Sequence, residues 1–125
     1  MAAPNIVGIT TVVGISTFLS LSNTSATVLL SNAASSSKVM KINSIIVAND
    51  DGTNTANIIV SINNAAAGGG TAFKLAHTID VIADSTLVLI DKASSFYLQE
   101  NQSIVVTASA GDDLDVFCSY EEISS

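Results

Sequence analysis

Side chains able to act as nucleophile or base are scarce, because His77 is the only histidine and Cys118 the only cysteine of the 125 residues. A Cys-His pair works only when a base next to the thiol tunes its pKa. His77 alternates in register with the apolar residues of 73–81, and Cys118 alternates with Leu114 and Val116. We therefore expect both to face the core and to be structural. Contact between them stays an alternative, but the prediction is a chain without catalytic residues, not an enzyme.

Two acidic runs raise the question of calcium, which takes six to eight oxygen ligands. They are Asp50-Asp51 and Asp112-Asp113-Asp115. Neither matches an EF-hand loop, so solvated turn carboxylates are predicted and no metal site, with calcium binding as the alternative. The triplet Gly68-Gly69-Gly70 lacks the Lys-Ser/Thr of a phosphate loop and predicts a flexible tip. No cofactor is expected.

The charge balance restricts the partners. The formal net charge is −7, and the only basic side chains are four lysines. Binding to nucleic acid phosphates, or to an anionic membrane surface, needs clustered Lys or Arg. Although the mean hydropathy is +0.52, no stretch reaches the roughly 18 apolar residues of a spanning helix. We therefore expect no nucleic acid and no membrane partner.

Short runs of β-forming residues separated by turn residues predict an all-β protein, a single-domain antiparallel β-sandwich of jelly-roll type with about eight strands. The domain is expected to span residues 1–125, with 1–22 partly an N-terminal arm. The segments expected to be extended are Ile6–Val13, Thr17–Leu21, Ala26–Leu30, Val39–Val47, Asn57–Ile62, Ala72–Ile82, Thr86–Ile90, Ser103–Ala108 and Leu114–Tyr120.

A few apolar residues are out of phase with the predicted core. Ile59, Val105 and Phe117 share strand faces with Asn, Ser, Thr and Asp. Either they are exposed and contact a partner, or a loop or the arm covers them. Together with Ile6 and Val7 of the arm, they are the predicted interface residues.

Several segments resemble small all-β virion structural proteins of tailed bacteriophages, especially those of marine cyanophages. The similarity lies in the opening 1–7, in 41–54 with its Asn-Asp-Asp-Gly turn, and in the ending 119–124. A turn of the type Leu-x-Glu-Gly-Asp-Ser-Ile in these proteins corresponds here to residues 98–104, LQENQSI, where Asn and Gln replace Gly and Asp.

The resemblance implies a structural component of a virion, located in the particle and repeated many times. A capsid decoration or cement protein is the predicted function. The alternatives are a neck, tail or fibre-attachment component, or a receptor- or glycan-binding module at a fibre tip. The partners would be other virion proteins, of capsid or tail, and copies of the chain itself.

Overall fold

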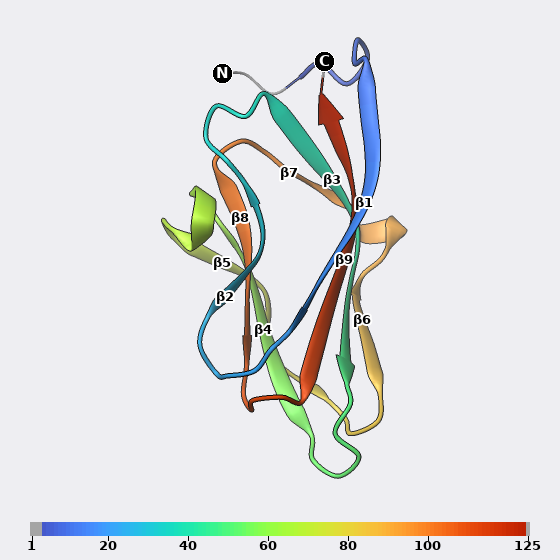
Figure 1. Ribbon diagram of the computed structural model, residues 1–125, viewed down its shortest axis with the longest axis vertical. Coiled ribbons are helices and arrows are strands. Elements are labelled where there is room, and N and C mark those ends of the chain that lie inside the picture. Colours follow the sequence, from blue (N-terminus) through green and yellow to red (C-terminus); the bar gives the residue numbers. More distant parts are fainter. Residues whose placement is uncertain (1–3, 125) are drawn as a thin grey trace.

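The computed structural model describes residues 4–124, which form nine β-strands and no α-helix (Figure 1). Two short 3-10 turns, η1 (Ala66–Gly68) and η2 (Lys92–Ser94), interrupt the strands. The strands are β1 (Thr11–Ser20), β2 (Thr27–Asn32), β3 (Lys38–Asn49), β4 (Ala56–Asn63), β5 (Ala72–Val81), β6 (Thr86–Ile90), β7 (Phe96–Leu98), β8 (Gln102–Ala108) and β9 (Leu114–Ser124).

The strands build two antiparallel sheets. Sheet A has the order β1-β9-β3-β6, with β7 also paired to β3, and sheet B has the order β2-β8-β4-β5. Figure 1 shows the two layers face to face, with strands early in the chain alternating between them. This double-sheet arrangement is that of a jelly roll. The predicted all-β sandwich is confirmed.

Two of the predicted strand boundaries were wrong. The segments 6–13 and 17–21 are not separate strands, because β1 runs unbroken through 11–20 and residues 4–10 precede it. Its continuity follows from pairing with β9 over its whole length, which carries the strand across Gly14. The three-residue strand β7 was not predicted, since so short a segment carries no alternation. Residues 1–3 and 125, which belong to the predicted domain, lie outside the described residues.

The core lies between the sheets and is formed by alternate residues of the paired strands. In β9 the side chains of Leu114, Val116 and Cys118 are buried while Phe117 points outward. In β4, Ile58 and Val60 are buried in the same alternating way. The largest fully buried apolar side chains are Ile42, Ile45, Ile58, Leu98, Ile104, Leu114, Val47, Val60, Val81, Val106 and Val116.

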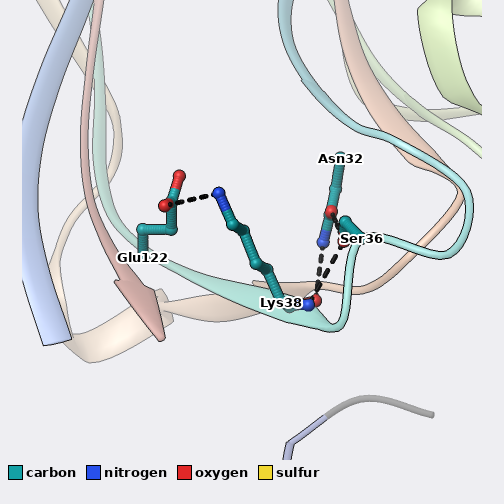
Figure 2. Close-up of polar contacts among 4 residues, drawn as sticks. All are labelled: Asn32, Ser36, Lys38 and Glu122. Atoms are coloured by element: carbon teal, nitrogen blue, oxygen red, sulfur yellow. Dashed lines mark hydrogen bonds and ion pairs between the residues drawn. The ribbon is translucent and has the colours of Figure 1, made fainter. Parts of the chain in front are cut away.

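Two buried asparagines connect the sheets at opposite ends of the sandwich. Asn32, at the end of β2, donates from Nδ2 to the carbonyls of Lys38 (3.0 Å) and Leu98 (3.1 Å), which belong to sheet A. Its Oδ1 accepts from the Ser36 hydroxyl, and Lys38 forms a surface ion pair with Glu122 at 3.0 Å (Figure 2). Buried amides of this kind must be fully bonded, so they fix how the two sheets meet.

At the other end, Asn49 of β3 has the same function. Its Nδ2 donates to the carbonyls of Asn54 and Val81, each at 2.9 Å, and Val81 belongs to sheet B. Its Oδ1 accepts from the backbone N–H of Asp51 at 2.9 Å. The asparagine therefore fixes the β3–β4 loop as well as the sheet packing.

The loop between β4 and β5 folds back over the outer face of sheet B. Backbone N–H groups of Ala67 and Gly68 donate to the hydroxyls of Ser31 and Ser103 at 2.9 and 3.0 Å. Asn63 donates to the carbonyls of Gly68 and Gly69. Gly68 is therefore held against β2 and β8, and the loop lies on sheet B.

Asn49→Ala is expected to destabilise the fold by about 2 kcal/mol, because it leaves the buried carbonyl of Val81 and the partly buried carbonyl of Asn54 and N–H of Asp51 without their partner. Asn5→Ala is the control, since Asn5 is exposed and outside both sheets. Urea unfolding followed by circular dichroism measures the difference. An Asn49→Ala protein as stable as the control would contradict the cross-sheet function of this side chain.

Candidate interaction surface

The thiol and the imidazole are on different sheets. Cys118 lies in the core on β9 with only 1% of its surface exposed, and burial raises its pKa to about 12. His77 is exposed on β5, the edge strand of sheet B. The alternative of a Cys-His dyad therefore has no geometric support.

The expected inward position of His77 was wrong, and the local backbone gives the reason. Thr78 has a positive φ of 52°, and the pairing of β4 with β5 shifts register between Ile58 and Val60. A second shift follows between Val60 and Ser61, and at each shift one extra residue on β5 exchanges the faces of the side chains beyond it. Ala76 and Val81 are therefore buried while His77 is exposed, and Phe73, which pairs with Ile62 on this edge strand, is 58% exposed.

The acidic turns come together at one end of the sandwich. Backbone hydrogen bonds join Asp50 N–H to the carbonyl of Asp113 (2.9 Å) and Asp84 N–H to the carbonyl of Asp51 (3.1 Å). Most of the eleven acidic residues lie at this end, here called the acidic end, and no lysine does. The acidic end comprises Asp50, Asp51, Asp80, Asp84, Asp112, Asp113 and Asp115.

Two carboxyls of the acidic end have shifted pKa values with opposite signs. Backbone N–H groups of Thr53 and Asn54 donate to Asp51 at 2.7 and 3.1 Å and lower its pKa. Partial desolvation, and then the negative charge of Asp51, raise the pKa of Asp113. Within residues 4–124, no group of three or more His, Cys, Asp or Glu is arranged to hold a metal ion.

The outer face of sheet A carries a row of apolar side chains that crosses all four main strands. Cross-strand pairing places Phe18 of β1 opposite Phe117 of β9, Phe117 opposite Ile46 of β3, and Ile46 opposite Val88 of β6. Phe18 is 69%, Val88 57% and Phe117 43% exposed. We call these four residues the apolar row. Such a contiguous apolar surface marks a site of interaction more often than scattered single residues do.

An open cleft of about 270 Å³ lies at the β1 end of the apolar row. The rings of Phe18 and Phe117 form its apolar side, with centroids 6.2 Å apart and planes tilted by 37°. Asp50 and Asp115 line it toward the acidic end. The cleft is smaller than typical small-molecule pockets and combines apolar surface with carboxylates.

The structure places the predicted interface residues in different environments. Phe117 is exposed in the apolar row, and Ile6 and Val7 are exposed before β1, Val7 at 92%. Ile59 is half-buried on the outer face of sheet B. Val105 is buried, because the loop that contains η1 covers it: a Cβ on Gly68 would lie 3.6 Å from its side chain. Of the two alternatives predicted for Val105, exposure or cover by a loop, the structure shows cover by a loop.

Sequence reasoning missed Phe18, Ile46 and Val88 as surface residues. Each follows an alternating pattern that assigns it to one face, but the pattern does not say which strands are neighbours. Only the register of four strands distant in sequence aligns these residues with Phe117.

Comparisons with known proteins support the fold. A subunit of Bacillus endospore appendages, described as disulfide-linked pili, has a similar structure with a TM-score of 0.50 and 17% identity over 91% of this chain and 88% of that one. A protein of infectious bursal disease virus, Gx strain, also has a TM-score of 0.50, with 14% identity over 91% of this chain and 33% of that one. Neither is described as a phage protein.

At these identities the similarity concerns the β-sandwich fold. No family model matches the sequence, and no curated protein matches it. None of the helices in the described part of the chain is long and apolar enough to cross a membrane.

Cys118 is expected not to react with a maleimide in the folded protein at pH 8. Its pKa of about 12 keeps the thiol protonated, and its burial blocks access. Mass spectrometry before and after unfolding in guanidinium chloride measures the labelling. Fast labelling of the native protein would contradict a core position.

Asp113→Asn and Asp51→Asn are expected to change stability at pH 7 in opposite directions. Because the pKa of Asp113 is raised in the folded protein, its favourable contribution to the free energy of unfolding is complete below 3.8, the pKa in the unfolded chain. This contribution is lost as the pH rises through the pKa of the folded protein. Asp113→Asn should therefore raise the unfolding temperature at pH 7. Asp51 has a lowered pKa, so its contribution is present above the unfolded value, and Asp51→Asn should lower that temperature.

Thermal unfolding at pH 3, 5 and 7 distinguishes the two carboxyls. Both differences from the unsubstituted protein should shrink toward pH 3, where the carboxyls become protonated. Equal shifts of the same sign in both variants would refute the assigned environments.

Proposed function

We propose that the chain is a non-enzymatic structural component of a tailed-phage virion, a capsid decoration or cement protein that contacts copies of itself and other virion proteins. The observation that carries this proposal is the apolar row, which crosses the outer face of sheet A on a rigid β-sandwich. Its exposed side chains lie where a neighbouring protein can cover them.

The composition of the surrounding surface supports the same function. Ser16, Ser119 and Ser44 border the apolar row on one side, and Ser20, Ala48 and Thr86 border it on the other together with Asp115. Small neutral side chains allow close approach and cost little to dehydrate. Such a surface suits a flat contact between repeated subunits.

The fold is compatible with this function. The appendage subunit, described as part of a pilus, is similar over nearly its full length, and the protein of a virus is similar over a third of its length. The assignment to a phage particle comes from the sequence resemblance in residues 1–7, 41–54, 98–104 and 119–124.

A second candidate is a neck, tail or fibre-attachment component, or a receptor- or glycan-binding module at a fibre tip. The cleft between Phe18 and Phe117 favours it, because aromatic rings with neighbouring carboxylates are groups that bind sugars. Tyr97 and Phe73, the other exposed aromatics, are on different sheets.

Immuno-electron microscopy of particles made from the genome that encodes the chain tests the location. Antibodies against the purified protein should label the shell at regular spacing. Label confined to the tail or fibres would support the second candidate instead. Intact particles without label, in a preparation where the protein is made, would contradict both.

Removal of residues 5–9, the exposed arm before β1, is expected to reduce the protein's occupancy on particles several-fold, because Ile6 and Val7 are 51% and 92% exposed within the subunit. Thr24→Ala, in the exposed β1–β2 loop, is the control that leaves the arm intact. Quantitative mass spectrometry of purified particles measures occupancy, with thermal unfolding as the check that the shortened chain still folds. Unchanged occupancy would remove the arm from the interface.

A further inference from the structure

We infer that the outer face of sheet A binds a second copy of this chain, face to face and with the strand directions reversed, about a two-fold axis that runs along the apolar row. The inference deepens the proposed function, on which it rests, by naming the face and the partner. Three observations carry the inference. The apolar row lies straight across the sheet, most of the side chains on both sides of it are small, and the acidic end and Lys41 lie on opposite sides of it along the strands.

A two-fold interface requires a self-complementary patch, in which residue i of one copy meets residue j of the other and the reverse. The apolar row satisfies this condition when it lies on the axis, because Phe18 and Val88 then meet their own counterparts. The border on one side consists of serines, and the border on the other side combines Ser20, Ala48 and Thr86 with Asp115. Two sheets can therefore approach to the usual spacing of about 10 Å.

Charge selects the reversed orientation. With the strands in the same direction, the acidic end of one copy would lie against the acidic end of the other, and like charges would meet. In the reversed orientation the acidic end faces the region around Lys41, which lies between Glu121 of β9 and Tyr97 of β7 on the same outer face. The other lysine of β3, Lys38, forms an ion pair with Glu122 of its own copy.

The spacing fits this match. Asp50 follows Ile46 by four residues toward the acidic end, which is about 13 Å at 3.3 Å per residue. Lys41 lies at the row of Glu121, four residues from Phe117 in the other direction and again about 13 Å away. Reversal about the apolar row therefore brings Lys41 of one copy opposite Asp50 of the other, twice in the dimer. Glu121 lies beside Lys41 in this region and accepts a hydrogen bond from Asn43 at 2.8 Å, so the electrostatic match is carried by the two Lys41–Asp50 pairs alone.

Substitution in the apolar row tests the face. Phe18→Ser and Val88→Ser are expected to raise the dissociation constant of the dimer about tenfold or more, since a core interface residue loses its apolar contact. Phe73→Ser is the matched control, because it removes another exposed phenylalanine from β5, on the other sheet. Sedimentation velocity of the purified full chain over a concentration series measures the constant.

Charge exchange tests the orientation. Lys41→Glu should weaken the dimer, because only carboxylates then face the acidic end, and the loss should shrink in 1 M salt. The double variant with Lys41→Glu and Asp50→Lys should restore association. Lys74→Glu on β5 makes the same charge change away from the face and should have no effect.

The results separate this inference from the proposed function. A chain that is monomeric at every concentration, or a dimer that Phe18→Ser and Val88→Ser leave unchanged, would overturn the inference, while regular label on the particle shell would keep the proposed function. A dimer lost with Phe18→Ser but not restored by the charge exchange would overturn the reversed orientation. If the chain is monomeric and binds a glycan through Phe18, the inference of a dimer is also overturned.

Discussion

The pairing of β9 on both edges constrains the rest of the structure. β9 bonds to β1 along ten residues of β1 and to β3 along nearly all of β3, so its register fixes three strands at once. The pleat then sends Leu114, Val116 and Cys118 to the core and Phe117 to the outside. A slip of one residue would exchange these faces, which the loss of buried apolar surface prevents. The core and the apolar row are therefore two consequences of one register.

Polar contacts complete what the apolar core cannot specify. Apolar packing is not directional, so it does not fix how far one sheet slides over the other. Asn32 of sheet B and Asn49 of sheet A fix the offset of the sheets at the two ends, because each side chain donates a hydrogen bond to a backbone carbonyl of the opposite sheet. At the acidic end, backbone hydrogen bonds hold Asp50, Asp51 and Asp113 close together although their carboxylates repel. Solvent screening keeps that repulsion small at the surface.

The sequence was sufficient for the sandwich because the alternation of β4 and β9 is clear and local. It failed at β5, where Thr78 takes a positive φ and shifts the register, so that His77 is exposed. It also failed to decide between exposure and cover for Val105, which depends on a loop that returns from β4. The apolar row needs the neighbour relations of β1, β9, β3 and β6. Those relations come from tertiary pairing, which single-sequence alternation does not contain.

The contrast between the edges and the face of the sandwich bears on how copies can associate. A long, flat, apolar edge strand invites pairing with another chain, and bulges or lysines on the edge oppose it. β5 has both, in the register shifts around Thr78 and in Lys74. On the outer face of sheet A, β1 pairs with β9 without a register shift, whereas β3 shifts register against β9 between Ile42 and Ser44 and against β6 between Ile45 and Ile46. Because most carboxylates lie at the acidic end, the apolar row is the part of this face on which association meets the least electrostatic resistance.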